Sequence, residues 1–266
     1  SGKVWVSKRL IFCIFVYSIN QMKSDMVTSP PVETTVAEQQ FESDTFETRS
    51  GKTLQITFIK HASLILAFDG KYIYVDPVSV GHPCVYIADF SQLPKADVIL
   101  ITHEHADHLD PKAIAALEKP GTVLITNASS QAKLGKGIIL KNGDSLQPVP
   151  WLHLEAVPAY NTTPDRMMYH PKNRDNGYVL TLGDERIYIA GDTEDIPEMK
   201  KLKAIDIAFL PVNQPYTMTV PQAANAAKMF KPHILYPYHY SNTDIIQLKE
   251  ALKDSPEIEV RIRQLQ

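Results

Sequence analysis

Four candidate metal ligands, His103, His105, Asp107 and His108, lie within a run of six residues. The run directly follows an apolar segment, residues 98–102, which predicts a buried strand. Three imidazoles and a carboxylate crowded together are costly to desolvate unless a positive charge lies among them. One or two divalent metal ions are the expected occupants, and the alternative is a polar turn that happens to be rich in histidine.

The spacing of these four residues favours two metals. Alternate residues of an extended segment point the same way, so His103 and His105 can share one ion. Asp107 and His108 continue around the turn and can address a second. Two-metal hydrolytic sites hold their ions about 3.5–4 Å apart. Since four ligands cannot fill two such sites, further ligands are expected at the ends of other strands.

Two later residues meet that expectation. Asp192 lies in a Gly-Asp turn after the apolar residues 186–190, where a bridging carboxylate is expected, and His239 ends the segment 234–238. Taken alone, a Gly-Asp pair is more often a turn, and a single histidine at a strand end is more often packing or surface. Their occurrence together with the histidine run favours ligation.

The pattern of strands and helices must position these side chains. From Thr53 onward short strand signals come first and helices are interspersed, which predicts an α/β fold of two mixed sheets packed face to face and covered by helices. Asp69-Gly70 predicts a hairpin turn, and Asp110-Pro111 predicts a helix start. The expected strands are 54–59, 63–68, 72–75, 98–102, 122–126, 152–157, 177–182, 186–190, 207–211, 234–238 and 259–263, and the later helices are 221–230 and 244–253.

The first fifty residues differ from the rest. A basic pair precedes the apolar residues 10–16, which are too few to span a bilayer and resemble a secretory signal. The alternatives are an upstream translation artefact and a strand of its own. Residues 24–50 are polar and predict a linker or an extended arm. We therefore expect residues 1–50 to be a signal-like segment and linker and residues 53–266 to form the domain, with a periplasmic or exported location if the signal is real and a cytoplasmic one otherwise.

Composition limits the partners. The net charge is −3, from 27 basic and 30 acidic residues, and no stripe of lysine and arginine stands out, which argues against a nucleic-acid partner. We expect a small-molecule substrate and no transmembrane helix. The sequence does not indicate the oligomeric state. The only cysteines, Cys13 and Cys84, form neither a disulfide scaffold nor a cysteine zinc site, so a metal must rely on histidine and aspartate.

The motifs also resemble a known superfamily. The run T-H-x-H-x-D-H-L, a downstream A-G-D-T and a late P-x-H-Y are similar to the metallo-β-lactamase-fold hydrolases, and within them to ascorbate-phosphate-lactonase-like and N-acyl-phosphatidylethanolamine-phospholipase-D-like proteins. The resemblance covers residues 53–266 and implies a four-layer αββα sandwich. It is specific for the superfamily and poorly specific for the substrate.

The resemblance implies a role for each ligand. His103 and His105 would hold the first metal, Asp107, His108 and His239 the second, and Asp192 would bridge them. Asp76 would orient the ligands without binding metal, or alternatively cap a turn before Pro77.

One position departs from the family pattern. Where the superfamily has a further histidine for the first metal, this chain has Asn161, and an amide oxygen is a weak zinc ligand. His170 follows nine residues later and can loop back to the metal. The alternatives are ligation by Asn161, which is otherwise a supporting residue, and a position left to water. His153 is expected mid-strand, as a packed or surface histidine.

The ligand set implies hydrolysis. Two zinc ions, or manganese or iron, would activate water and polarise the substrate oxygen of a small ester, lactone or phosphodiester. Asp107 would steer the attacking hydroxide, and His61 lies near the metals in relatives, although it can also simply pack. A metal-binding or regulatory module without turnover is the alternative function, and a nuclease would need a basic groove. Possible substrate contacts are Arg166, Lys172, Arg174 and Tyr216, each of which is also consistent with a solvated loop or with packing.

Overall fold

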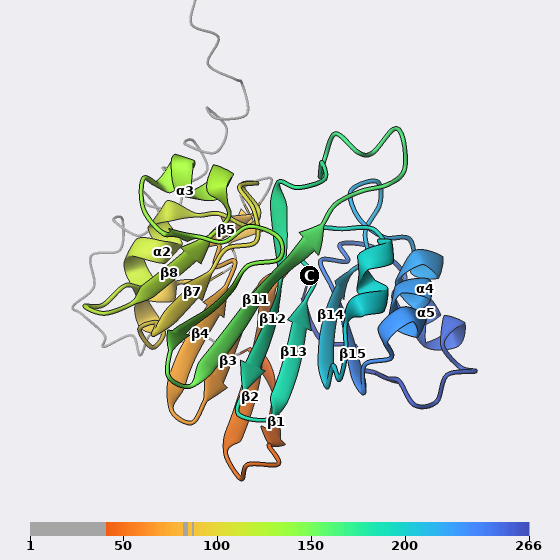
Figure 1. Ribbon diagram of the computed structural model, residues 1–266, viewed down its shortest axis with the longest axis horizontal. Helices are drawn as coiled ribbons and strands as arrows, with labels where there is room; N and C mark the ends of the chain where they lie inside the picture. Colours follow the sequence, from red (N-terminus) through yellow and green to blue (C-terminus); the bar gives the residue numbers. More distant parts are fainter. Residues whose placement is uncertain (1–40, 82–84, 87, 266) are drawn as a thin grey trace, which may run out of the picture.

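Two seven-stranded sheets packed face to face make up the fold (Figure 1). The computed structural model describes residues 41–81, 85–86 and 88–265. Helices lie on the outer side of each sheet, so the chain has the expected order of layers, helix, sheet, sheet, helix. The predicted α/β sandwich of two mixed sheets is confirmed.

The first sheet is built from the first half of the described chain. Its strand order is β1-β2-β3-β4-β7-β8-β9, with β1 to β4 antiparallel and β4, β7, β8 and β9 parallel. The strands are β1 (Glu42–Glu47), β2 (Thr53–Lys60), β3 (Ser63–Phe68), β4 (Lys71–Val75), β7 (Val98–Leu100), β8 (Val123–Thr126) and β9 (Ile138–Ile139). A separate short pair, β5 (Val80–Gly81) and β6 (Val85–Tyr86), lies between β4 and β7 in the chain.

The second sheet repeats this plan. Its strands follow chain order from β10 to β16, with β10 to β13 antiparallel and β13 to β16 parallel. They are β10 (Ser145–Val149), β11 (Leu152–Ala159), β12 (Asp175–Leu182), β13 (Glu185–Ile189), β14 (Ile207–Pro211), β15 (Ile234–Tyr238) and β16 (Glu259–Val260). The parallel strands of both sheets therefore end at loops that can meet above the sandwich, which is where sites form in such folds.

Helices cover the outer faces. On the first sheet lie η1 (Phe90–Gln92), α2 (Pro111–Leu117) and α3 (Ala128–Leu134), and on the second η2 (Pro197–Lys201), α4 (Val220–Phe230) and α5 (Ile246–Ala251) (Figure 1). The Asp110 side chain accepts a hydrogen bond from the backbone N–H of Lys112 and Pro111 begins α2, as the sequence predicts.

The core between the sheets is apolar and partly aromatic. Phe58 of β2 contacts Tyr236 and Phe209 of the opposite sheet, with ring centroids 5.0 and 6.3 Å away. All three side chains are buried. Burial of large apolar side chains on both facing surfaces is the main source of stability in a sandwich of this kind. The two sheets are therefore held in a fixed relation beneath the loops.

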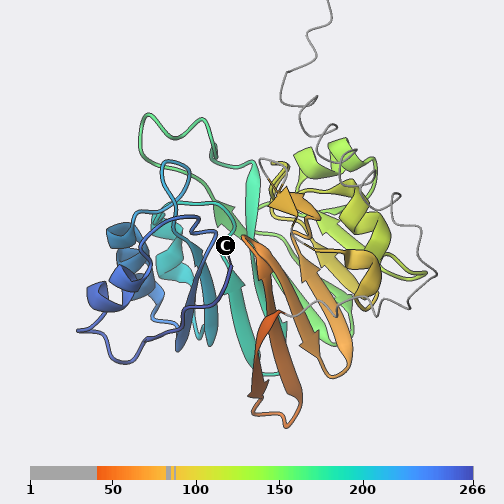
Figure 2. The same ribbon diagram turned by 180° about the vertical axis from the view of Figure 1, so that it is seen from behind.

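The structure differs from the sequence prediction in several elements, and the short strands β5, β6, β9 and β10 and the helices η1 and η2 were not predicted. Residues 42–47, interpreted as linker, form β1 and pair with β2 along their whole length (Figure 2). Helix α3 was not predicted, since its surface is largely polar. Helix α5 and strand β16 are shorter than the predicted 244–253 and 259–263. The signal-like residues 10–16 lie outside the described residues.

Candidate metal centre

The chemical side chains gather at one end of the sandwich. His103, His105, Asp107 and His108 lie on the loop after β7, Asp192 follows β13, and His239 follows β15. His170 lies on the connection between β11 and β12, which rises above the sheets at the top of Figure 1. The ends of strands from both sheets thus bring together residues that are far apart in the sequence.

The ligand atoms form two adjoining groups of four residues, in each of which they all lie within 4.8 Å of one another. The first group is His103, His105, His170 and Asp192, and the second is His61, Asp107, His108 and His239. A third, smaller group of Asp76, His103 and His108 shares one histidine with each of them. One carboxylate oxygen contacts both of the four-residue groups: Oδ2 of Asp192 is 3.1 Å from Nε2 of His170 and 3.3 Å from Nε2 of His239. Asp192 therefore lies where a bridging ligand must lie.

His170 and Asn161 occupy different roles in this geometry. His170 joins the first group through Nε2, while its Nδ1–H donates to the backbone carbonyl of Tyr216 at 3.0 Å. Asn161 lies outside both groups, and its Nδ2 donates to the backbone carbonyls of Arg166 and Tyr216. The looped-back histidine, and not the amide, is the residue that the fold brings to the other ligands.

Hydrogen bonds on the far ring nitrogens orient the other histidines. Nδ1 of His108 donates to Oδ2 of Asp76 at 2.7 Å, and Asp76 also accepts from the N–H and hydroxyl of Thr102. Nδ1 of His239 donates to Oδ1 of Asn213 at 2.9 Å. Such outer partners fix the tautomer and aim Nε2 at the ligand position.

The sequence analysis did not predict the roles of two of these hydrogen-bond partners, Thr102 and Asn213. Thr102 precedes His103 in the ligand run, and its position in that motif is the only signal that marked it. Asn213 follows β14, and its place as a polar residue just after a buried strand is the sequence feature that could have indicated a role at the site.

The donor set fits a cation. His170 Nε2 and Asp192 Oδ1 are buried and have no hydrogen-bond partner among the described residues. Buried polar atoms of native proteins are normally satisfied, and a metal ion is the partner that accepts lone pairs from imidazole and carboxylate together. Three histidines and a carboxylate in one group, with no thiolate, suit zinc and also admit manganese or iron.

The pKa shifts of the ligand residues also indicate that positive charge stabilises the buried carboxylates of the site. Burial alone would lower the pKa of His239, but the carboxylates of Asp192 and Asp107 raise it to about 9. Burial likewise opposes ionisation of Asp192, yet the surrounding histidines His108, His239 and His103 hold its pKa well below the usual range. Because ligands shed their protons on binding metal, a cation would take over the charge that the protonated histidines otherwise supply.

His61 is the member of the second group that comes from a turn between two strands. It occupies the turn between β2 and β3 in a left-handed conformation, with φ of 58°. Its Nε2 is 2.9 Å from Oδ2 of Asp107, and its ring centroid is 3.7 Å from that of His239. Burial and the neighbouring His239 lower its pKa to about 4, so the imidazole is neutral near pH 7. Its backbone N–H donates to the carbonyl of Leu265.

The four candidate substrate residues are placed differently. Arg174 is near the ligands, with Nη2 3.4 Å from Nε2 of His105, and it also forms an ion pair with Asp175. Tyr216 is 45% exposed and packs edge to face on Tyr169. Lys172 instead lies over the ring of Tyr160, and Arg166 takes part through its backbone, whose carbonyl accepts from Asn161.

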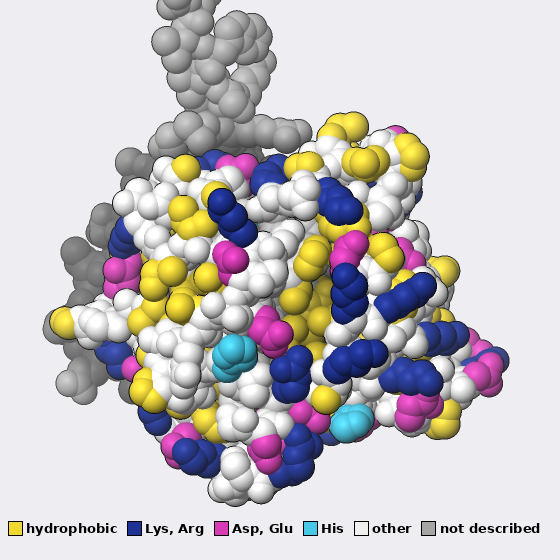
Figure 3. Space-filling view, viewed as in Figure 1, with side chains coloured by type: hydrophobic (Ala, Val, Ile, Leu, Met, Phe, Trp, Pro, Cys, Tyr) yellow, Lys and Arg dark blue, Asp and Glu magenta, His cyan; other side chains and the backbone are white. Residues whose placement is uncertain are grey.

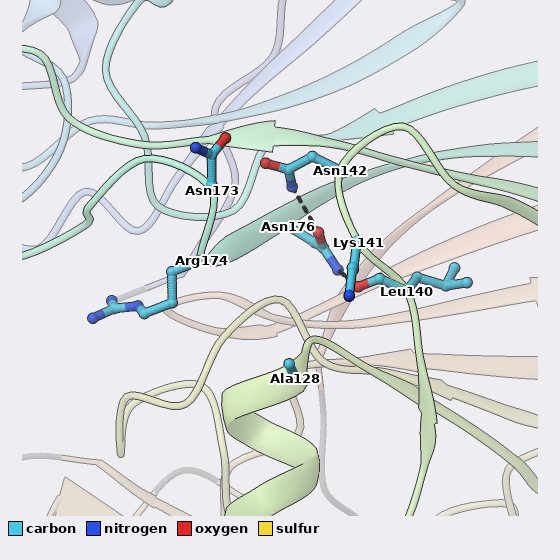
Figure 4. Close-up of a pocket in the computed structure, with 7 residues that line it drawn as sticks. All are labelled: Ala128, Leu140, Lys141, Asn142, Asn173, Arg174 and Asn176. Carbon is cyan, nitrogen blue, oxygen red and sulfur yellow. Dashed lines mark hydrogen bonds between the residues drawn. The ribbon is translucent and has the colours of Figure 1, made fainter.

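A polar pocket is lined in part by Arg174. Its volume is about 230 Å³, and it lies between the start of α3 and the start of β12 (Figure 4). Three amides line it, Asn142, Asn173 and Asn176, and Nδ2 of Asn142 donates to Oδ1 of Asn176 at 2.8 Å. Arg174 is therefore the lining residue that also contacts a member of the first ligand group, His105.

The surrounding surface carries mixed charge. Lysine and arginine side chains gather over the part of the face where η2 and α4 lie, with acidic side chains among them (Figure 3). The last turn of η2 carries Lys200 and Lys201, and that of α4 carries Lys228. Within the described ranges, every helix is too short or too polar to cross a membrane.

Comparisons with known proteins agree with this architecture. A family profile described as "Beta-lactamase superfamily domain" matches residues 55–239. A UPF0173 metal-dependent hydrolase of Ligilactobacillus salivarius is 31% identical over 213 residues, 77% of this chain and 94% of that protein. One from Flavobacterium johnsoniae is 32% identical over 219 residues, covering 75% and 91%.

Solved structures give the same picture. A presumed metal-dependent hydrolase of Parabacteroides distasonis is 64% identical, with a TM-score of 0.81 over 85% of this chain and 100% of that one. Igni18, a metallo hydrolase of Ignicoccus hospitalis, is 24% identical with a TM-score of 0.65, over 80% of this chain and 95% of that one. The second similarity shows the fold alone.

Proposed function

The chain belongs to the beta-lactamase superfamily, and from this premise we propose that it is a dinuclear zinc hydrolase of a small ester, lactone or phosphodiester. The observation that carries the proposal is the place of Asp192, whose Oδ2 lies 3.1 Å from His170 in one ligand group and 3.3 Å from His239 in the other. One carboxylate shared by two imidazole-rich groups supports two adjacent cations.

The proposed ligands follow the two groups. His103, His105 and His170 would hold the first metal, Asp107, His108 and His239 would hold the second, and Asp192 lies within reach of both groups. When bound, the metals supply an activated water near neutral pH and a Lewis acid for the substrate oxygen. Zinc is proposed because imidazole dominates the donor set, and manganese or iron are the other metals this set admits.

Asp107 and His61 are the residues proposed to orient the attacking water and to transfer a proton. Oδ2 of Asp107 is 2.9 Å from Nε2 of His61, so the carboxylate and the imidazole form a pair at the edge of the second group. His61 is partly exposed, whereas His103 and His108 are fully buried. We assign Asp107 to orienting the attacking water and His61 to exchanging a proton with the substrate, since proton transfer by a positioned side chain needs hydrogen-bond reach and access.

Substrate contacts are assigned by their distance from the ligands. Nη2 of Arg174 lies 3.4 Å from Nε2 of His105, and the backbone carbonyl of Tyr216 accepts from Nδ1 of His170. We assign these two residues, which adjoin the first group from outside its ligand atoms, to contacts with the outer part of a substrate. Arg174 already pairs with Asp175, so it places a substrate oxygen more than it attracts a net negative charge.

The test is a metal count combined with a substrate panel. Purified protein, stripped and then reloaded with zinc, is expected to bind two ions per chain and to hydrolyse one class among nitrophenyl esters, lactones and bis(nitrophenyl) phosphate. The variant His103→Ala is expected to lose turnover. Two bound ions with no hydrolysis of any class would instead favour a metal-binding module, and cleavage confined to RNA would favour a nuclease.

A further inference from the structure

Glu194 is a buried carboxylate that the proposed chemistry does not use. It is fully buried, two residues beyond Asp192, and forms no ion pair with any lysine, arginine or histidine of the described residues. An ionised carboxylate away from water costs several kcal/mol unless hydrogen bonds compensate it. Its surroundings therefore have to supply donors.

Four donors surround this carboxylate. The backbone N–H groups of Thr162 and Thr163 donate to Oε1 at 3.1 and 3.0 Å. The hydroxyl of Thr163 donates to Oε2 at 2.6 Å, and Nε2 of Gln222 donates to the same oxygen at 2.5 Å. Both oxygens are thus doubly satisfied, and three of the four donors belong to one loop.

That loop is the one that carries His170. Residues 160–174 connect β11 to β12 without strand or helix, and long irregular connections are mobile unless contacts hold them. The loop is closed at its other end because the N–H of Asn161 donates to the carbonyl of His170 at 2.8 Å. The hydrogen bonds to Thr162 and Thr163 therefore hold the start of the loop, to which the backbone of His170 is bonded.

The anchor is itself rigid. Gln222 donates to Glu194 from the first turn of α4, where it also forms a reciprocal capping pair with Thr219. On the other side, Thr193 exchanges hydrogen bonds with the backbone of Tyr160, and the N–H of Glu194 donates to the Tyr160 carbonyl at 3.0 Å. The short segment from Asp192 to Glu194 thus sets where the loop begins relative to the bridging carboxylate.

We propose that Glu194 is a positioning residue for the first metal, which holds the loop after Tyr160 so that His170 supplies the ligand that Asn161 does not. This inference rests on the proposed dinuclear site. It predicts an unequal effect on the two metals, because His170 belongs to the first group only and the second group has no ligand on this loop.

The test variant is Glu194→Gln, which keeps the size of the side chain and removes the acceptor for the two donors that meet one of its oxygens. Apo-protein titrated with zinc against a chelating dye is expected to bind its second-site ion normally. The affinity of the first site is expected to fall about 10-fold, the lower end of the range for losing a direct partner of a ligand, because Glu194 acts on His170 only through the loop. Cobalt substituted for zinc gives a second readout, since the visible spectrum of the first site should change and that of the second should not.

A milder variant and a control keep the test decisive if Glu194→Gln folds poorly. Thr163→Val removes one donor to Glu194 and is expected to give a smaller loss in the same direction. The control is Asp206→Asn, which alters a buried carboxylate at the opposite end of the sheet, where it accepts from the N–H of Arg186 at 2.8 Å. It is expected to lower stability and to leave both ions in place.

The outcomes separate this inference from the proposal beneath it. If the parent chain binds two ions and Glu194→Gln and Thr163→Val bind both with unchanged affinity, Glu194 does not position His170 and only the dinuclear proposal stands. An equal loss of affinity for both ions would show that Glu194 has a general structural role, and it would also overturn the inference. A parent chain that binds fewer than two ions overturns the dinuclear proposal and this inference with it.

Discussion

Nδ1 of His108 lies 2.7 Å from Oδ2 of Asp76, and both side chains are buried. Asp76 adopts a left-handed conformation, with φ of 43°, at the residue after β4. It also accepts two hydrogen bonds from Thr102, the residue before His103. One carboxylate of the first sheet therefore aims a ligand of the second metal and steadies the start of the ligand run.

The first prediction concerns this carboxylate. Asp76→Ala is expected to lower zinc affinity at the second site about 10–100-fold, because His108 loses the acceptor that fixes its ring. Zinc titration of the apo-protein measures this, with Asp97→Ala as control, a carboxylate that accepts from the N–H of Tyr72 away from the ligands. Unchanged affinity in Asp76→Ala would contradict the orienting role.

Metal removal is expected to destabilise the fold. A ligand that binds only the folded state at about 1,000 times its Kd adds about 4 kcal/mol of stability. At about 2–4 °C per kcal/mol for a domain of this size, one tightly bound zinc should raise Tm by about 10 °C. Calorimetry with and without a chelator measures the shift, and His170→Ala should retain only part of it. Equal Tm values for parent protein with and without zinc would argue against tight binding.

Local signals made much of the fold predictable. Asp69-Gly70 forms the turn between β3 and β4 with both residues at positive φ, as a two-residue hairpin requires. The helix at Asp110-Pro111 was equally clear, since cap and first helical residue are adjacent in sequence. The same holds for the ligand run after β7, whose members are near neighbours along the chain. Each of these features depends on a few consecutive residues.

The unpredicted features depend on distant contacts. Strand β1 is mostly polar, and its place in the sheet is stabilised by Asp44, which pairs with Arg263 near the end of the chain. The return of His170 to the other ligands depends on Glu194 and Tyr216, which follow it by many residues. No local pattern records such pairings, so the sequence left His170, Asn161 and water as open alternatives.

Asp44 provides a pH-dependent prediction. Burial alone would raise its pKa, but hydrogen bonds from Tyr236 and Arg263 and the charge of Arg261 lower it. A folded-state pKa below the unfolded value means that the stabilisation is present above about pH 4 and is lost as the pH falls through the folded pKa. Asp44→Asn should therefore cost about 1–2 kcal/mol of the free energy of unfolding at pH 7 and much less near pH 3.

Urea denaturation of the metal-free parent and Asp44→Asn proteins at several pH values measures this difference. Metal-free protein is needed because the ligand histidines and carboxylates release or bind protons with the metal. A difference that stays constant from pH 7 to pH 3 would show that the charge of Asp44 does not contribute.

Gly177 is predicted to be intolerant of a side chain. A Cβ at this position would lie 2.7 Å from the backbone carbonyl oxygen of Ala190, which precedes the turn that carries Asp192. Gly177→Ala is expected to cost about 1–3 kcal/mol of stability and, because the clash is with backbone, to weaken zinc binding as well. Gly70→Ala is the control, since open space surrounds its Cβ position. It should cost about 1 kcal/mol through its positive φ and leave zinc affinity unchanged.

His61 tests the division between ligands and catalytic groups. His61→Ala is expected to lower turnover about 10²–10⁴-fold, the range for a lost general acid or base, and to leave two zinc ions per chain. The reason is its contact with Asp107 at the exposed edge of the second group, where it can reach substrate. His153→Ala, which changes an exposed histidine of β11, should alter neither quantity. Should His61→Ala bind a single zinc ion, the imidazole would be a metal ligand in its own right, and the proton-transfer role would have to be given up.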